Sequence, residues 1–206
     1  PMKKSLFLFD FDGTITTQDT LVAFLIFYKG KLKFFMGMLL LSPVLVLYIL
    51  KLIPNWKGKQ MVLRWFIGGE DVQTFNRRCR EFSTHILPSL IKPQALHSIY
   101  THLKATSATV VVVSASAENW VRPWCEQLGI ACVATKLDVV NGKITGNLCG
   151  PNCYGPEKVK RIEKEFTLTD YDEIVAYGDS SGDREMFAIA HHRHYKPFRV
   201  STTETA

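Results

Sequence analysis

Two pairs of aspartates follow short apolar runs near opposite ends of the chain. Asp10 and Asp12 stand in DFDGT directly after SLFLF, and Asp179 and Asp183 stand in GDSSGD after EIVAY. The glycine in each loop allows the chain to turn, so both carboxylates of a pair can face one crevice. Four acids close together repel one another, and a divalent cation relieves that repulsion. A hard site built of oxygen atoms favours Mg²⁺.

Two further stretches supply groups that bind phosphate. Ser114 follows a run of valines, and its small neighbours Ala115 and Ser116 leave backbone N–H groups accessible to an oxyanion. Lys158 stands at a predicted helix start marked by Pro156, where its ammonium can neutralise phosphate charge. A nucleophilic carboxylate, a cation, a hydroxyl and an ammonium around one point are the set that phosphoryl transfer needs.

These residues must be positioned by strands and helices that alternate along the chain. Short apolar runs predict buried strands at 5–9, 108–116 and 173–179. Strands separated by helices indicate an α/β fold, with a parallel sheet covered by helices on both faces. Ligands then bind at the carboxyl ends of the strands. Helical patterns are expected at 117–128, 156–166 and 182–190.

Two features interrupt this alternation. Residues 20–95 form a long helical insertion, which we interpret as a cap, so the catalytic core comprises residues 1–19 and 96–206. Within 135–148, Asn141-Gly142 separates two alternating runs, which is a strong signal for a small β-hairpin.

Four motifs, in their order along the chain, resemble the motifs of a known family. DFDGT, VVVSAS, GPEK and YGDSSGDREM are similar to the motifs of the haloacid dehalogenase superfamily, in its phosphoserine-phosphatase-like branch, subfamily IB. The helical cap between the first two motifs, the NG hairpin and the closing KPFR extend the resemblance from Leu6 to Arg199. It implies a Rossmann-like core. The apolar, basic cap also resembles that of the phosphatidylglycerophosphate phosphatases of this superfamily.

The resemblance implies a role for each aspartate. Asp10 would be the nucleophile that forms an aspartyl-phosphate, and Asp12 would protonate the leaving alcohol and then activate water. Asp10, the backbone carbonyl of Asp12 and Asp179 would hold Mg²⁺, and Asp183 would orient a water on the metal. The family's dehalogenases lack an acid at the position of Asp12, so its presence favours phosphate esters.

The resemblance also assigns the substrate contacts. Asp19 stands where phosphoserine phosphatases carry a glutamate that touches the substrate amine, and Arg64 is a loose candidate for their carboxylate-binding cap arginine. Gly182 replaces their usual asparagine in the last loop. These departures weaken serine as the leaving group. The residues expected to bind the phosphate are Thr14, Ser114, Ala115 and Lys158.

Charge and hydrophobicity are concentrated in the same part of the chain. The net charge is +6, but 21–69 contains seven Lys and Arg residues and no acid, so the rest of the chain carries −1. Hydrophobic residues make up 47% of the total, and their excess lies in 20–53. A segment both basic and apolar suits an anionic membrane surface or a phosphorylated substrate better than nucleic acid, which we do not expect as a partner.

The run FFMGMLLLSPVLVLYIL, residues 34–50, has no charged side chain. A transmembrane helix needs about 20 apolar residues, and Ser42-Pro43 interrupts this run. A single crossing would also separate Asp10 from the three later motifs, which must meet it around one phosphate. We therefore expect either a helix pair bent near Ser42-Pro43 that enters and leaves a bilayer on the same side, or a helix buried within the cap.

Three functions remain open. The first is a Mg²⁺-dependent phosphatase for a membrane-located or lipid-like phosphomonoester, such as phosphatidylglycerophosphate. The second is a soluble phosphatase for phosphoserine or another small metabolite, and the third is a membrane-surface binding module without catalysis. We expect a cytoplasmic location, with peripheral attachment to the inner face of the cytoplasmic membrane in the first case. No obligate protein partner is inferred.

The histidines of HHRH, at His191, His192 and His194, carry no assigned role. Such a cluster can bind a transition metal, but we expect exposed histidines at a helix end beside Arg193.

Overall fold

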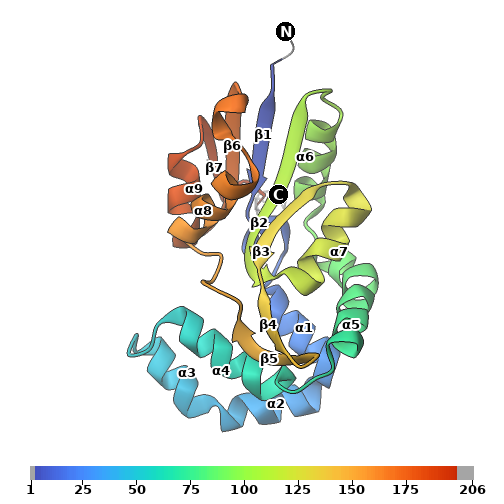
Figure 1. The fold of residues 1–206 in the computed structure, drawn as a ribbon, viewed down its shortest axis with the longest axis vertical. Helices are drawn as coiled ribbons and strands as arrows, with labels where there is room; N and C mark the ends of the chain where they lie inside the picture. Colours follow the sequence, from blue (N-terminus) through green and yellow to red (C-terminus); the bar gives the residue numbers. More distant parts are fainter. Residues whose placement is uncertain (1–2, 199–206) are drawn as a thin grey trace, which may run out of the picture.

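The computed structural model describes residues 3–198, and a five-stranded sheet with the order β3-β2-β1-β6-β7 forms its centre (Figure 1). All neighbouring strands in this sheet are parallel. β1 lies between β2 and β6, so the three strands predicted from the sequence are adjacent. The strands are β1 (Ser5–Phe9), β2 (Ala108–Ala117), β3 (Ala131–Thr135), β6 (Glu173–Gly178) and β7 (His192–Tyr195).

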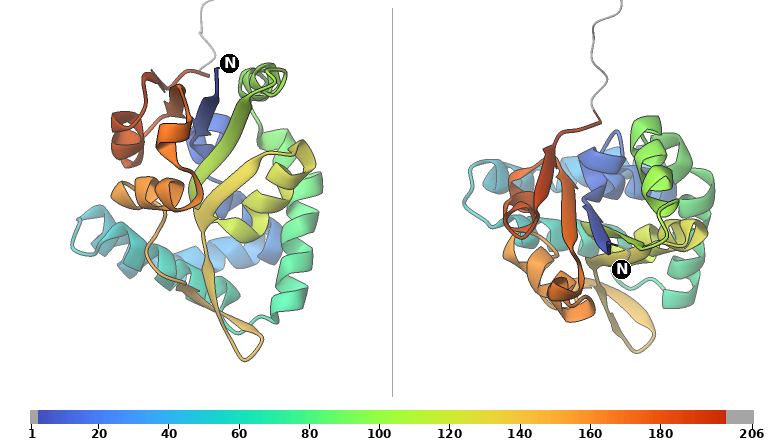
Figure 2. Two further views of the ribbon diagram at one scale, coloured as in Figure 1. Left: turned by 45° about the horizontal axis from the view of Figure 1, so that its top comes forward. Right: turned by 90° about the horizontal axis from the view of Figure 1, so that it is seen from above.

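Helices cover both faces of the sheet, as predicted. Alternate residues of β1 point to opposite faces. Phe7 and Phe9 join one buried cluster with residues of α6 (Pro93–Leu103) and α7 (Glu118–Leu128). Leu6 and Leu8 join a second cluster with α8 (Pro156–Glu165) and α9 (Arg184–Ala188). The two groups of helices lie on opposite sides of the strands in the right-hand view of Figure 2. The predicted α/β fold is confirmed.

The helices of residues 20–67 lie beyond the carboxyl ends of the strands, at the bottom of Figure 1, and the helix of residues 72–85 lies beside α7. The predicted hairpin lies beside the insertion, formed by β4 (Leu137–Val140) and β5 (Lys143–Leu148) around Asn141 and Gly142, which both have positive φ. Gly69, just after α4 (Asn55–Ile67), donates its backbone N–H to the Ile144 carbonyl, which joins the end of this helix to the hairpin. The division into a core and a cap stays a prediction. The helices are α1 (Thr20–Lys29), α2 (Lys31–Leu40), α3 (Ser42–Ile49), α4 (Asn55–Ile67) and α5 (Val72–His85).

The apolar run 34–50 is split between α2 and α3, which are bent by 64° relative to each other. Pro43 lies in the first turn of α3, as expected from the Ser42-Pro43 break. Within residues 3–198, no single helix is both long and apolar enough to cross a bilayer, although the bent pair passes that test together. α2 buries Phe34 and Gly37, whereas α3 has no buried residue. The alternative in which this run forms a helix buried within the cap is therefore wrong for α3.

The region after β6 differs from its prediction. Ser181–Asp183 form a 3₁₀ turn, and α9 then runs only from Arg184 to Ala188. The Asp183 side chain accepts hydrogen bonds from the backbone N–H groups of Asp179 and Ser180, and these bonds tighten the turn. A continuous helix over 182–190 is therefore wrong.

The expected position of the histidine cluster at a helix end is also wrong. Residues His192 to Tyr195 form β7 and pair with β6 at the edge of the sheet. His191 precedes the strand, and its Nδ1 accepts a hydrogen bond from the Ile174 backbone N–H. The imidazole of His194 stacks on Tyr177 with ring centroids 4.7 Å apart. Pairing with the preceding strand β6 decides this conformation, and the pattern within residues 191–195 does not show it.

Candidate active site

The predicted chemical groups meet at the carboxyl ends of three adjacent strands. Asp10 follows β1, Ser114 lies in β2, and Asp179 follows β6. Lys158, in the first turn of α8, reaches this point with a side chain that is 2% exposed. The structure therefore brings together the residues of the four motifs, while their roles stay predictions.

Lys158 connects the loops around Asp10. Its Nζ donates to Asp10 Oδ1 at 2.6 Å, to Asp183 Oδ1 at 2.6 Å and to the Val113 carbonyl at 2.9 Å. Burial lowers the pKa of Lys158, but the two carboxylates outweigh burial and raise that pKa well above its usual value. Lys158 is therefore a fixed positive charge beside Asp10.

The two oxygens of the Asp10 carboxylate accept hydrogen bonds from different groups. One oxygen accepts from the Lys158 ammonium, and the other accepts from a hydroxyl. Thr14 Oγ1 donates to Asp10 Oδ2 at 3.0 Å. Burial raises the pKa of Asp10 to about 7, against the opposing effect of Lys158. Thr14 thus orients the carboxylate in this structure, and its expected contact with phosphate stays a prediction.

Asp12 is held by a separate set of donors. Its Oδ1 accepts from the Thr20 backbone N–H at 2.7 Å and from Thr20 Oγ1 at 2.6 Å, and its Oδ2 accepts from Ser116 Oγ at 2.6 Å. Trp120 Nε1 donates to Thr20 Oγ1 at 3.2 Å and fixes that hydroxyl. Burial raises the pKa of Asp12, and these donors oppose the rise. The Asp12 carboxylate therefore faces Thr20 and Ser116, whereas Lys158 contacts Asp10. Its role in proton transfer stays a prediction.

The roles of Thr20 and Ser116 in holding Asp12 were not predicted. The sequence presents Ser116 only as a small neighbour of Ser114, and Thr20 only as the start of the helical insertion. Their side chains meet at Asp12 because α1 folds over the end of β2, where the two hydroxyl oxygens lie 3.1 Å apart. Neither spacing along the chain nor residue type indicates that contact.

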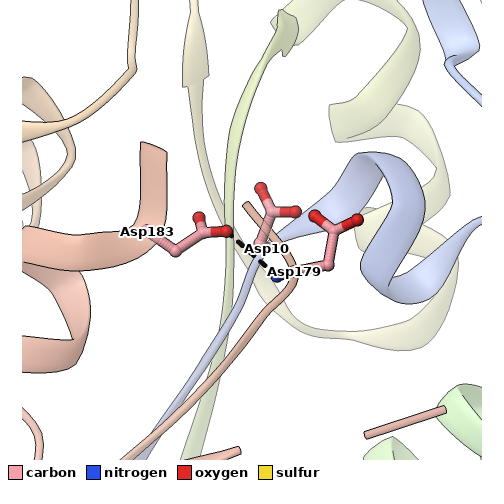
Figure 3. A group of neighbouring side chains, drawn as sticks. All are labelled: Asp10, Asp179 and Asp183. Atoms are coloured by element: carbon pink, nitrogen blue, oxygen red, sulfur yellow. Dashed lines mark hydrogen bonds between the residues drawn. The ribbon is translucent and has the colours of Figure 1, made fainter. Parts of the chain in front are cut away.

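Three carboxylates form a group that fits a hard cation. Oxygen atoms of Asp10, Asp179 and Asp183 lie within 4.8 Å of one another (Figure 3). A Cβ at Gly13 would lie 2.4 Å from Asp179 Oδ2, so glycine, with φ +79°, is needed for this close approach. Because every donor is oxygen, the set suits Mg²⁺ better than a metal that prefers nitrogen or sulfur. The side chain of Asp12 points elsewhere, so only its carbonyl could contribute.

Asp183 is fully buried, and both of its oxygens have partners in the protein. Oδ1 accepts from Lys158, while Oδ2 accepts from the N–H groups of Asp179 and Ser180 and from Ser180 Oγ. The N–H of Asp179 is drawn donating to it in Figure 3. These contacts suit a residue that positions the Asp179 loop. The expected role of Asp183 in orienting a water on the metal stays a prediction.

The end of β2 faces the same space. Ser114 is fully buried, and its Oγ accepts the Ser116 backbone N–H at 2.9 Å. The Ala115 carbonyl accepts a hydrogen bond from Lys59 Nζ. Phosphate binding by Ser114 and Ala115 stays a prediction.

Lys59 is a further candidate that sequence reasoning missed. It reaches from α4 to the strand ends, where its Nζ donates to the Ala115 carbonyl and lies 3.3 Å from Asn152 Oδ1. Burial lowers its pKa, and the nearby carboxylates of Asp12 and Asp19 oppose this effect. Its only signal in the sequence is that it belongs to the acid-free basic segment.

A cavity of about 550 Å³ joins these groups to the helical insertion. Asp10, Asp12, Lys59, Lys158 and Asp179 line one end of it. This volume is in the usual range for small-molecule sites. The other end is apolar, with side chains from α1, α2, α3 and α4 that include Leu25, Phe34, Met38, Val44, Leu45 and Val62.

The structure places the two further substrate-binding candidates, Asp19 and Arg64, differently. Asp19 lines the cavity, and its Oδ1 also caps α1 by accepting from the N–H groups of Leu21 and Val22. Arg64 is not among the residues that line the cavity, because its Nε donates to Asn147 Oδ1 on the hairpin at 2.5 Å. Positions 59 and 64 face different sides of α4, and the structure turns Lys59, in place of Arg64, toward the site.

Gly182 accommodates an aromatic ring in this chain. A Cβ at position 182 would lie 2.3 Å from Tyr154 Cε2, and the Tyr154 hydroxyl lies 2.9 Å from Ser181 Oγ. Tyr154 also lines the cavity. The asparagine usual in the resembling phosphatases would therefore displace this ring, which gives the glycine a packing reason.

Comparison with known proteins gives sequence relatives and fold neighbours. A sequence model of the haloacid dehalogenase-like hydrolases matches residues 7–188. "Protein CicA" of Caulobacter vibrioides (strain NA1000 / CB15N) is 37% identical over 196 residues, which cover 94% of this chain and 86% of that protein.

Solved structures share the fold at lower identity. A protein of unknown function from Bordetella pertussis Tohama I superposes with a TM-score of 0.79 at 19% identity, over 93% of this chain and 89% of that one. A substrate-bound phosphoserine phosphatase complex gives 0.65 at 20% identity, over 94% and 86% of the two chains. A phospho-aspartyl intermediate analogue of phosphoserine phosphatase gives 0.64 at 20% identity, over 93% and 85%.

Proposed function

The chain belongs to the haloacid dehalogenase-like hydrolase family, and on that premise we propose that it is a Mg²⁺-dependent phosphomonoester hydrolase. The membership expected from the four motifs is confirmed. The observation that carries the proposal is the position of the Asp10 carboxylate, which lies beside the buried ammonium of Lys158 at the polar end of a cavity. A fold neighbour is a phospho-aspartyl analogue of a phosphoserine phosphatase, which supports a carboxylate nucleophile.

In the proposed reaction, a carboxylate oxygen of Asp10 attacks phosphorus, and the bond from phosphorus to the leaving oxygen breaks. Asp12 donates a proton to that oxygen, so an alcohol departs and an aspartyl-phosphate remains. Asp12 then removes a proton from water as the water attacks phosphorus, and the bond to Asp10 breaks to release inorganic phosphate. The raised pKa of Asp12 suits the first proton transfer, and its three donors stabilise the carboxylate needed for the second.

The remaining groups manage charge. Lys158 places its ammonium on Asp10, where it can also contact a phosphoryl oxygen. Asp10, the Asp12 carbonyl and Asp179 would hold Mg²⁺, which when bound neutralises charge on the phosphoryl group and on the carboxylates. Asp183 keeps the Asp179 loop in place through its hydrogen bonds to two backbone N–H groups.

The shape of the cavity favours a substrate with an apolar tail. The wall opposite the aspartates is built from side chains such as Leu25, Phe34, Met38 and Val62. A lipid-like phosphomonoester, of which phosphatidylglycerophosphate is one example, would place its phosphate on Asp10 and its chain against this wall. A small polar phosphate such as phosphoserine is the second candidate, favoured by Lys59, whose ammonium offers a partner for a carboxylate.

A panel of phosphate esters tests this function. We expect phosphate release from a detergent-solubilised phosphatidylglycerophosphate, with weaker release from phosphoserine, and loss of both when EDTA removes divalent cations. Excess Mg²⁺ should restore turnover. The catalytic proposal fails if the purified protein releases no phosphate from any ester with Mg²⁺ present, which would leave a binding module. Preference for phosphoserine would retain the phosphatase and reject the lipid-like substrate.

Replacing Lys59 tests its role at the polar end of the cavity. Loss of one charge-assisted hydrogen bond to the substrate should raise KM by about 10- to 100-fold in Lys59→Met, with a smaller change in kcat. The substrate is the ester that the panel selects, dissolved or solubilised in neutral detergent so that no anionic bilayer contributes to KM. Lys57→Met is the matched control, because Lys57 is exposed on the same helix and does not line the cavity. Equal KM values for the two variants would remove Lys59 from the site.

A further inference from the structure

The outer surface of the α2–α3 pair is strongly apolar. Six large side chains on the pair and the residue after it are 61–74% exposed. We call these six the docking surface. Exposed apolar residues on a protein surface are usually scattered singly, and a group of this size within one helix pair indicates an interaction site. The six residues are Leu32, Phe35, Leu39, Leu40, Ile49 and Leu50.

The same two helices are apolar on their inner side. Phe34 and Met38 of α2, with Val44 and Leu45 of α3, line the apolar end of the cavity. A helix that is apolar all round is found in a protein interior or in lipid. Because α3 has no buried residue, its outer side is not covered by the described part of this chain.

Charge around the docking surface indicates what covers it. Lys31, Lys33, Lys51 and Lys57 flank the surface, are exposed, and have no carboxylate within 4.0 Å among residues 3–198. There is no acidic residue between positions 21 and 69. A second copy of the chain packed here about a two-fold axis would bring the same lysines together. An anionic lipid surface complements both the lysines and the apolar side chains.

The position of the pair in the chain agrees with attachment to one surface. Figure 1 shows α2 and α3 at the end of the molecule farthest from the N-terminus of β1, below the strand ends that carry Asp10 and Asp179. The chain runs from β1 through α1 into the pair, and from the pair through α4, α5 and α6 to β2, so it enters the pair from the sheet and afterwards returns to the sheet. Trp56 follows the pair and is 44% exposed, as is common for aromatic residues at a bilayer interface.

We propose that the α2–α3 pair lies in the surface of an anionic bilayer and that the apolar end of the cavity receives its substrate from that bilayer. The second part rests on the proposed function. The six residues of the docking surface insert among the lipid chains, and the lysines lie at the level of the anionic headgroups. The apolar tail of the phosphate ester then passes from the bilayer to the inner side of the same helices, while its phosphate reaches Asp10.

Co-sedimentation with lipid vesicles tests the docking step without turnover. The wild-type chain should bind vesicles of phosphatidylcholine that contain phosphatidylglycerol more tightly than vesicles of phosphatidylcholine alone. The double variant Leu39→Glu/Ile49→Glu should bind the phosphatidylglycerol vesicles roughly 100-fold more weakly or worse, because two charges would enter the apolar layer. The matched control is Val139→Glu/Val140→Glu on the hairpin, where both valines are exposed, and it should bind like wild type.

The lysines give a separate test of charge. Each lysine near an anionic surface contributes about a fivefold change in affinity, so Lys31→Gln/Lys33→Gln/Lys51→Gln should bind roughly 100-fold more weakly. The control is a triple variant that changes three exposed lysines elsewhere on the protein, Lys104→Gln/Lys136→Gln/Lys143→Gln. Its affinity for the vesicles should fall much less. Equal binding of the two triple variants would overturn the charge argument.

Other outcomes separate this proposal from the proposed function. All four variants should hydrolyse the water-soluble ester para-nitrophenyl phosphate at the wild-type rate, because no altered residue lines the catalytic end of the cavity. Vesicle binding without any hydrolysis would contradict the proposed function and still support the docking surface. Hydrolysis without vesicle binding would overturn the docking surface. A stable dimer that Leu39→Glu/Ile49→Glu converts to monomer, with no vesicle binding, would assign the surface to a second copy.

Discussion

Asp10→Asn is expected to reduce kcat on the order of 10⁴-fold or more, because an amide cannot serve as the nucleophile that accepts the phosphoryl group. The substitution keeps the size of the side chain, and Thr14 Oγ1 and Lys158 Nζ remain next to it. The fold should therefore persist. Steady-state hydrolysis of para-nitrophenyl phosphate with Mg²⁺ measures the loss, and thermal unfolding checks the fold.

The control for Asp10→Asn is Asp170→Asn. Asp170 is exposed at the end of a 3₁₀ turn before β6 and does not line the cavity, so its replacement should leave kcat unchanged. If Asp10→Asn retains a tenth or so of the wild-type kcat with the fold intact, another group is the nucleophile. Ser114 would then be the next residue to replace.

Lys158→Met is expected to damage both stability and turnover. The substitution would leave Asp10 and Asp183 buried without their shared counter-charge, and breaking a buried ion pair costs about 3–5 kcal/mol in the free energy of unfolding. It also removes the ammonium beside the reacting phosphate, so kcat should fall about 10³-fold even in molecules that remain folded. Urea unfolding measures the first effect, and hydrolysis by the folded fraction measures the second.

Lys160→Met provides the comparison for Lys158→Met. Lys160 is exposed on the same helix, and replacing it should change the free energy of unfolding by about 0.5 kcal/mol or less. A Lys158→Met variant as stable as Lys160→Met would contradict the network seen here. A variant that is destabilised but turns over normally would confine Lys158 to a structural role.

The sequence predicts the centre of the site well for a physical reason. Asp10 and Asp179 come directly after buried strands, and parallel strands place their carboxyl ends at one edge of a sheet. Lys158 follows from a helix start marked by proline. These positions are set by local patterns together with the topology of the sheet, and both can be inferred from the chain.

The residues that surround this centre depend on how distant segments pack. Lys59 reaches Ala115 only because α4 lies across the end of β2, and Thr20 reaches Asp12 only because α1 folds back over the same loop. Their spacing along the chain carries no record of these contacts. Arg64 had the more suggestive residue type, but the rotation of α4 turns it toward the hairpin.

β7 and the α2–α3 pair show the same difference between features set by the local sequence and features set by packing. β7 is specified by pairing with β6, so the histidine-rich segment looked like a helix end in isolation. The bend between α2 and α3, by contrast, was predictable, because proline disfavours a continuous helix through position 43. Which sides of those helices stay exposed depends on what they pack against, and that required the structure.

Trapping the covalent intermediate tests catalysis through Asp10 most directly. The wild-type chain is mixed with a radiolabelled phosphate ester and Mg²⁺, quenched in acid within one turnover, and digested for peptide mapping. We predict label on the peptide that contains Asp10, released by hydroxylamine as expected for an acyl phosphate, and absent from Asp10→Asn. Label on a different peptide, or complete turnover by wild type with no labelled protein at any time, would contradict catalysis through an aspartyl-phosphate at Asp10.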